Sequence, residues 1–184
     1  MSNAQIADHG ENLIRMRNVL QDQRRAFQAE GVPDVKTRVD RINRLIAMIV
    51  DNERKIIEAE RADFCCKSEA LIRLGEIFGT LSALRYARDR VVEWMKPERV
   101  ELPAEHESLG MHAELHHRPL GTIGVISPWN GPIILSCMPL ASIFSAGNRA
   151  MIKPSEFVPA TATLLEQLVT ANFDPSELAV INGD

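Results

Sequence analysis

Two short segments of the chain carry side chains that could act on a small-molecule ligand. The first, GVISPWN, runs from Gly124 to Asn130, and the second, GNRAMIKPSE, runs from Gly147 to Glu156. Each has an apolar run that ends in polar residues, which is typical of a buried parallel strand whose carboxyl end opens onto a ligand crevice. An amide can donate to a developing oxyanion, and a carboxylate can accept from ligand hydroxyls. We therefore expect Asn130, Lys153 and Glu156 to lie at one sheet edge.

The order of these motifs resembles the NAD(P)-dependent aldehyde dehydrogenase superfamily, whose members carry a Pro-Trp-Asn turn followed by a Lys-Pro-Ser-Glu turn. Both turns are intact, at residues 128–130 and 153–156. Three other segments look like the coniferyl aldehyde dehydrogenase branch: Ala62-Asp63-Phe64, Glu76-Ile77-Phe78 and Trp94-Met95-Lys96-Pro97. The resemblance implies oxidation of an aldehyde to its carboxylic acid, with a coniferyl-aldehyde-like aromatic substrate as one candidate. Hydride would pass from a cysteine thiohemiacetal to NAD, and hydrolysis would follow.

The resemblance also implies a role for Asn130. The matching asparagine of the family donates to the oxyanion that forms when a thiolate attacks the aldehyde, and removal of one such donor typically costs about 2.7 to 4 kcal/mol. The alternative is an asparagine that closes the turn to Pro132 and caps the next helix. Many relatives have an aromatic residue after this asparagine, whereas this chain has Gly131. The wall of an aldehyde tunnel would therefore be open or filled differently.

The second turn implies a cofactor site. In the family, the residues that match Lys153 and Glu156 hold the adenosine ribose hydroxyls, and Ser155 belongs to the same turn. A carboxylate there would repel a 2′-phosphate, so NAD is expected rather than NADP. The alternative is an ordinary helix start that Ser155 or Glu156 caps. On the other turn, the residues that would line the nicotinamide side are Ser127, Pro128 and Trp129, although Trp129 could also be a packing residue.

The cysteines do not match the family nucleophile, which lies downstream of the Lys-Pro-Ser-Glu turn. Cys137 falls on an apolar helix face, and Cys65 and Cys66 have no identifiable activating base. The family's base glutamate and second glycine-rich turn also have no match. The resemblance thus implies an amino-terminal portion, truncated before the catalytic domain and inactive alone. One alternative is a non-catalytic nucleotide-binding or oligomerisation module. Another is an acyl-phosphate or acyl-CoA reductase, and the two intact turns argue against this one.

Helical spacing of apolar residues predicts the elements before residue 97. Leu13, Met16, Leu20 and Phe27 indicate one helix, and a second, capped by Asp34, carries a stripe of residues to about residue 51. A third helix passes through Ile56 and Ile57. A fourth follows the cap Ser68 and carries these apolar residues: Leu71, Leu74, Ile77, Phe78, Leu81 and Leu84.

The remainder predicts a sheet. Alternation at Met111, Ala113 and Leu115 indicates an extended hairpin. In the resembled family this region pairs with another subunit, so the resemblance implies a partner site. The alternative is a plain surface hairpin. Strands at 122–126, 149–152 and 178–181 alternate with helices at 132–146 and 159–171, and Pro139 should kink the first helix. The predicted fold is α/β, with a helical region (1–97), a hairpin arm (98–120) and a partial, Rossmann-like NAD-binding β-α-β-α-β unit (121–184).

Composition excludes several classes of partner. The net charge of −4 gives no basic footprint for nucleic acid, and no apolar segment is long enough for a membrane span or a secretory signal. The spacing of His112, His116 and His117 fits no standard metal site. We therefore expect a cytoplasmic protein with no metal, membrane or nucleic-acid partner. An exposed sheet edge and apolar helix faces predict a homo-oligomer.

Overall fold

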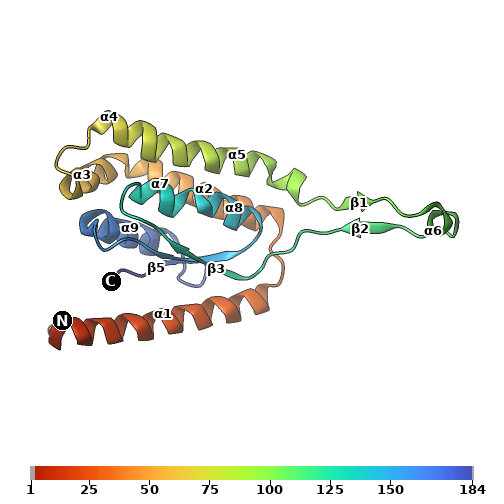
Figure 1. Ribbon diagram of the computed structural model, residues 1–184, viewed down its shortest axis with the longest axis horizontal. Helices are drawn as coiled ribbons and strands as arrows, with labels where there is room; N and C mark the ends of the chain where they lie inside the picture. Colours follow the sequence, from red (N-terminus) through yellow and green to blue (C-terminus); the bar gives the residue numbers. More distant parts are fainter. Residues whose placement is uncertain (1–2, 184) are drawn as a thin grey trace.

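The fold joins a set of amino-terminal helices to a projecting arm and a small parallel sheet (Figure 1). The structure is a computed structural model that describes the backbone of residues 3–183 and the side chains of residues 10–183. The first helices are α1 (Asn3–Glu30), α2 (Val35–Asp51), α3 (Glu53–Asp63), α4 (Glu69–Leu71), the π-helix η1 (Ile72–Phe78) and α5 (Gly79–Trp94). Within these residues, no helix has the length and apolar character that crossing a bilayer requires.

The predicted parallel sheet is confirmed. Its strands are β3 (Thr122–Ile126), β4 (Arg149–Lys153) and β5 (Leu178–Val180), in the order β3-β4-β5. The pairing aligns Ile126 with Lys153 and Ile152 with Val180, so the carboxyl ends of all three strands meet at one edge. The crossover segments are α7 (Pro132–Cys137), α8 (Pro139–Ser145) and α9 (Pro159–Asn172). This is the expected β-α-β-α-β order.

One predicted helix, at residues 132–146, is two helices. It is interrupted at Met138, where α7 ends and α8 begins with Pro139. Proline has no N–H, so Pro139 cannot continue the hydrogen-bond ladder and instead takes the first position of a new helix. Gly147 ends the segment as predicted, with a left-handed φ of 85°.

A second difference concerns the helix after Ser68. Ser68 does cap it, since its Oγ accepts a hydrogen bond from the Leu71 N–H at 3.2 Å. However, Leu74 and Phe78 are 69% and 60% exposed, whereas Ile72 is fully buried. The reason is that residues 72–78 form a π-helix, whose i→i+5 ladder turns a different set of side chains inward.

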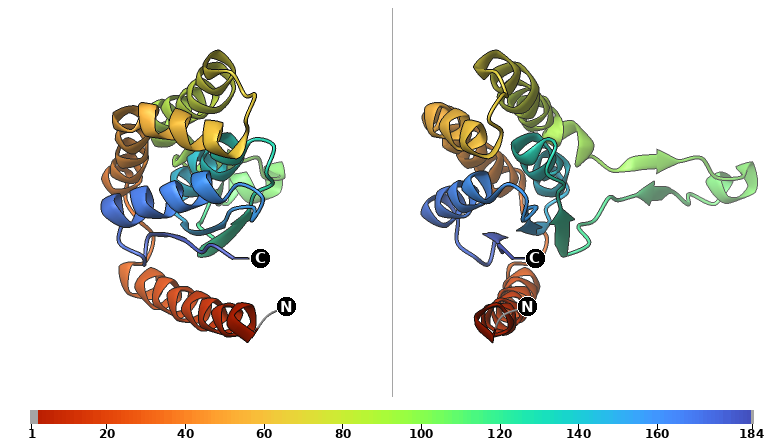
Figure 2. Two further views of the ribbon diagram at one scale, coloured as in Figure 1. Left: turned by 90° about the vertical axis from the view of Figure 1, so that its left-hand side faces the viewer. Right: turned by 60° about the vertical axis from the view of Figure 1, so that its left-hand side comes forward.

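The core lies between the sheet and the helices on one of its faces. Helices α8 and α9 pack against this face, α2 and α5 form an outer layer over them, and α1 crosses the opposite face (Figures 1 and 2). Fully buried core side chains include Ile42, Leu45, Leu84, Leu140, Phe144 and Ile152. On the α1 side, the buried Gln23 amide donates to the carbonyls of Ala150 and Pro175 at 2.8 and 2.9 Å. The sheet is therefore held from both faces.

The hairpin arm is confirmed. Strands β1 (Glu98–Val100) and β2 (Ala113–Leu115) pair antiparallel, and the short helix α6 (Ala104–Ser108) forms the tip. Met111, which the alternation pattern included, lies outside the strand. The arm projects away from the helices and the sheet (Figure 2).

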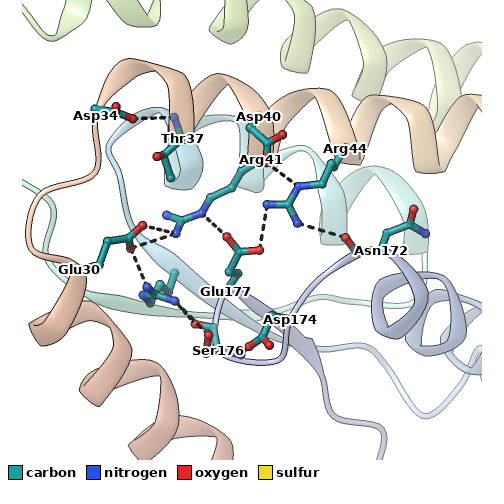
Figure 3. A network of polar contacts seen from close by, with 11 residues as sticks. Glu30, Asp34, Thr37, Asp40, Arg41, Arg44, Asn172, Asp174, Ser176 and Glu177 are labelled. Carbon is teal, nitrogen blue, oxygen red and sulfur yellow. Dashed lines mark hydrogen bonds and ion pairs between the residues drawn. The ribbon is translucent and has the colours of Figure 1, made fainter.

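A buried arginine network joins α1 and α2 to the amino ends of β4 and β5 (Figure 3). Arg41, with a side chain only 1% exposed, lies 3.0 Å from both Glu30 and Glu177. Arg149, at the start of β4, contacts Glu30 at 2.6 Å, and Arg44 contacts Glu177 at 2.9 Å. A buried charge costs free energy unless it is paired, so each partner depends on the others.

We predict that Arg41→Ala lowers the free energy of unfolding by about 1.5 to 3 kcal/mol, because it removes a buried side chain and its charge-assisted hydrogen bonds to the partly exposed Glu30 and Glu177. Urea unfolding measures the change. The control is Arg54→Ala, which removes a 90% exposed arginine from an ion pair with Glu58 and should change stability by less than about 1 kcal/mol. Equal effects of the two substitutions would contradict the prediction.

Candidate functional site

The two predicted turns meet at the carboxyl edge of the sheet. The register of β3 and β4 continues past the strands, because the Ser127 N–H donates to the Lys153 carbonyl at 3.1 Å. The structure thus places Ser127, which precedes the Pro-Trp-Asn turn, beside Lys153, which begins the Lys-Pro-Ser-Glu turn. Asn130 and Glu156 are both exposed at this edge.

The second turn presents a paired cation and carboxylate. Lys153 Nζ lies 3.2 Å from Glu156 Oε2 and donates to the Pro154 carbonyl at 3.0 Å. Their side chains are 27% and 42% exposed. Ser155 is buried, and its Oγ accepts from the Phe157 N–H at 3.2 Å. An ammonium and a carboxylate side by side can bind a pair of ligand hydroxyls, which both donate and accept.

Asn130 does not cap the helix that follows it. The first free N–H groups of α7, those of Ile133 and Ile134, donate to Glu76 Oε2 at 3.2 and 3.0 Å. A carboxylate at this position also interacts favourably with the helix dipole. The capping alternative for Asn130 is therefore wrong, because Glu76 from η1 occupies the cap.

The same arrangement occurs at α9. Asp63, the last residue of α3, accepts from the N–H groups of Ala160 and Thr161 at 2.9 and 2.8 Å. It also accepts from the Thr161 hydroxyl at 2.7 Å. Neither Ser155 nor Glu156 caps the helix, so that alternative is wrong as well.

The other residues of the first turn differ in exposure. Trp129 is 52% exposed, and its ring centroid lies 6.5 Å from that of Phe64. Ser127 is buried, with its hydroxyl 2.7 Å from the Ser136 hydroxyl. Gly131 is buried too, and a Cβ there would lie 3.0 Å from Ile134 Cγ2. A side chain at position 131 would therefore point toward α7.

Behind the first turn lies a buried charged cluster. Lys67 Nζ contacts Glu60 at 2.6 Å and Glu76 at 2.7 Å. Burial raises the pKa of Glu60 to about 7, Lys67 opposes this rise, and the nearby charge of Glu76 adds to it. Lys67 Nζ also lies 4.8 Å from the centroid of the Phe64 ring, and the Trp129 ring lies next to that of Phe64.

The cysteines have different environments. Cys137 is buried in the core, as predicted, and burial raises the pKa of its thiol to about 12. Such a thiol has almost no thiolate at neutral pH, and the thiolate is the nucleophile. Cys65 and Cys66 are exposed in the turn after α3.

A hollow of the structure lies away from this edge. It measures about 750 Å³ and lies at the amino ends of the strands, beside the base of the arm, where its lining includes Trp94, His117, Leu120 and Asn148. The hollow beside Lys153 and Gly183 measures about 40 Å³, much less than an enclosed ligand pocket of about 300 Å³ or more. The polar groups at the carboxyl edge therefore suit ribose hydroxyls at an open surface. The described residues do not form a closed pocket there.

The predicted site residues omitted Asp63, Glu76 and the cluster of Glu60 and Lys67. Asp63 and Glu76 lie in two of the segments that resemble the coniferyl aldehyde dehydrogenase branch, so the sequence did mark these positions. Their function as caps depends on contacts across 57 to 98 residues, which no local pattern encodes.

Comparison with known proteins agrees with the motifs. The sequence profile of the Aldehyde dehydrogenase family matches residues 8–184. A coniferyl aldehyde dehydrogenase of Pseudomonas sp. is 40% identical over 172 residues, which are 92% of this chain and 34% of that protein. The chain spans about a third of the length of such curated relatives.

Solved structures share the fold. Substrate-bound AldH of Staphylococcus aureus has a TM-score of 0.87 at 29% identity, over 92% of this chain and 36% of that one. An indole-3-acetaldehyde dehydrogenase of P. syringae, solved with NAD+ and IAA, has a TM-score of 0.74 at 22% identity, over 91% of this chain and 33% of that one. These likenesses confirm the predicted fold class.

We predict that stability falls as pH rises because of Glu60. Between about pH 4.5 and 7 the unfolded chain has lost this proton while the folded chain keeps it, so raising the pH favours unfolding. Glu60→Gln removes this contribution. Its free energy of unfolding relative to wild type should therefore increase between about pH 5 and pH 8, by at most about 3 kcal/mol.

Urea unfolding of both proteins at the two pH values measures the difference. Glu58→Gln, which changes a 62% exposed glutamate on the same helix, is the control and should show no such change. A difference between Glu60→Gln and wild type that stays constant with pH would contradict the assignment.

Proposed function

This chain belongs to the aldehyde dehydrogenase family, and from that premise we propose that it supplies the adenosine half-site and the oxyanion donor for NAD(P)-dependent oxidation of an aldehyde to a carboxylic acid. The observation that carries the proposal is the hydrogen bond from Ser127 N–H to the Lys153 carbonyl. It joins the Pro-Trp-Asn turn to the Lys-Pro-Ser-Glu turn at the carboxyl edge, where open parallel sheets bind their ligands.

The ion pair of Lys153 and Glu156 supports the cofactor assignment. The carboxylate would accept hydrogen bonds from the adenosine ribose hydroxyls, and the ammonium would donate to them. The same carboxylate would repel a 2′-phosphate, which favours NAD over NADP. When bound, NAD supplies the acceptor for the hydride. Ser155, whose hydroxyl accepts from Phe157 N–H, would maintain the shape of the turn.

The first turn would serve the reacting carbonyl. The exposed amide of Asn130 would donate to the oxyanion that forms when a thiolate attacks the aldehyde. Trp129 and Pro128 are exposed on the same turn and would border the nicotinamide side. Ser127, whose hydroxyl contacts Ser136, would act through its backbone. An aromatic aldehyde of the coniferyl type is the substrate that the relatives' names favour.

Turnover also needs a thiolate beside the oxyanion donor. Cys137 cannot supply it, because its thiol is buried and its pKa is about 12. We propose that the nucleophile is not among these 184 residues and that the chain by itself binds cofactor without turnover. NADH formation from an aldehyde by this chain, if abolished by Cys65→Ser or Cys66→Ser, would overturn this assignment.

We predict that isothermal titration calorimetry detects binding of NAD to the chain and that Glu156→Ala weakens it at least roughly tenfold, because hydrogen bonds to a charged group are lost. The control is Glu107→Ala, which removes a similarly exposed and ion-paired carboxylate from the arm and should leave NAD binding unchanged. Absence of binding by the parent chain would contradict the half-site and favour an assembly module.

We also propose a homo-oligomer. Strand β3 is an edge strand, and Ile126 at its end is 85% exposed. The projecting arm presents further exposed strands. Edges of this kind pair readily with another chain.

Light scattering should therefore report a dimer or larger assembly. Ile126→Lys, which places a charge on the exposed edge, should shift the population toward monomer. The matched control is Val92→Lys on α5, a 54% exposed apolar residue that is not part of a strand. A compact monomer at high protein concentration would contradict the proposal.

A further inference from the structure

We infer that Glu76 is a positioning residue that holds the turn of Trp129 and Asn130 in place through the start of α7. The inference rests on the proposed role of Asn130 as oxyanion donor. Glu76 does not reach the ligand edge itself. It acts through the backbone that carries Asn130, from a buried position behind the turn.

The direct connection is short. Glu76 Oε2 accepts from the N–H groups of Ile133 and Ile134, and the helix that they begin starts at Pro132, two residues after Asn130. An oxyanion donor stabilises charge only if its amide is fixed where the charge develops. Glu76 therefore fixes the carboxyl side of the turn, while Ser127 N–H and the Lys153 carbonyl fix its amino side.

A second connection runs from the same cluster to Trp129. Lys67 Nζ holds the other oxygen of Glu76 at 2.7 Å and lies over the Phe64 ring at 4.8 Å. The Phe64 and Trp129 rings in turn have centroids 6.5 Å apart, within the range of favourable aromatic pairs. The cluster therefore acts on the turn at Trp129 as well as through α7.

The π-helix η1 makes these contacts possible. Its wide turn puts Ile72, Glu76 and Ile77 on the buried side. Gly79 follows, and a Cβ there would lie 2.8 Å from Ile134 Cδ1, so the helix approaches α7 more closely than a side chain at this position would allow. π-Helical turns are rare in proteins overall, and those that do occur are often found at functional sites. The local geometry is thus specialised for bringing one carboxylate to the start of α7.

The chain contains its own matched control. Asp63 caps α9 in the same way, through the N–H groups of Ala160 and Thr161. It borders the second turn instead of the first. Loss of either cap removes one carboxylate that accepts from two N–H groups at a helix start, so the two substitutions remove similar hydrogen bonds at different places.

The experiment uses the whole chain with Trp94→Phe, which leaves Trp129 as its single tryptophan. Glu76→Ala, Glu76→Gln and Asp63→Ala are made in this background. Amide hydrogen exchange is measured residue by residue by NMR, and acrylamide quenching reports the exposure of Trp129. Neither readout requires NAD or an aldehyde, so failure of this inference and failure of the proposed function can be told apart.

We expect Glu76→Ala to speed exchange at Ile133 and Ile134 by roughly tenfold or more and to change the quenching of Trp129. Glu76→Gln keeps an acceptor oxygen and should restore part of the protection. Asp63→Ala should speed exchange at Ala160 and Thr161 and leave exchange at Ile133 and Ile134 unchanged.

Unchanged exchange and quenching in Glu76→Ala would overturn the inference. So would a uniform increase across α5, α7 and α9, or the same increase at Ile133 and Ile134 in Asp63→Ala, because either result would mean general destabilisation. If Glu76→Ala does not fold, Glu76→Gln decides the question. A selective increase at Ile133 and Ile134 supports the inference, and its absence overturns it.

Discussion

The first N–H groups of a helix have no partner within the helix, and the structure depends on how the two crossover segments meet this need. At α7 and α9 the acceptors are carboxylates from the amino-terminal helices, Glu76 and Asp63. Each cap fixes a helix relative to the sheet and also fixes η1 or α3 relative to that helix. The amino-terminal helices are thereby held to the parallel sheet at the edge where the polar turns lie.

The amino ends and the carboxyl ends of the strands carry different charged groups. At the amino ends of β4 and β5, Arg41 and Arg149 are buried and paired with Glu30 and Glu177. At the carboxyl ends, Lys153 and Glu156 are paired but partly open to solvent. Buried pairs tie elements together, whereas exposed pairs contribute little to stability and can exchange partners. This difference is consistent with a structural edge and a ligand-binding edge.

Much of this could be predicted from the sequence, because the determining signals are local. Asp34 and Ser68 cap helices as expected, and the apolar runs at β3 and β4 define both strands and the turns that follow them. The failures have non-local causes. The π-helix depends on packing against α7, and the caps at Glu76 and Asp63 join residues 57 to 98 positions apart. The break at Pro139 was signalled locally, because proline has no N–H for the helix ladder and takes the first position of a new helix.

The π-helix also has a consequence for changes in chain length. Each residue of an α-helix turns the following side chains by about 100°, so deleting one residue, such as Gly75, would rotate all later residues relative to the earlier ones. In a regular α-helix the 19 steps from Ile72 to Val91 would leave these two buried side chains about 100° apart, and 18 steps would align them, so the wide turn of η1 absorbs one extra residue. A chain without Gly75 should therefore form a regular α-helix that keeps Ile72 and Val91 on one face, whereas a further residue inserted in 72–78 would turn one of them outward.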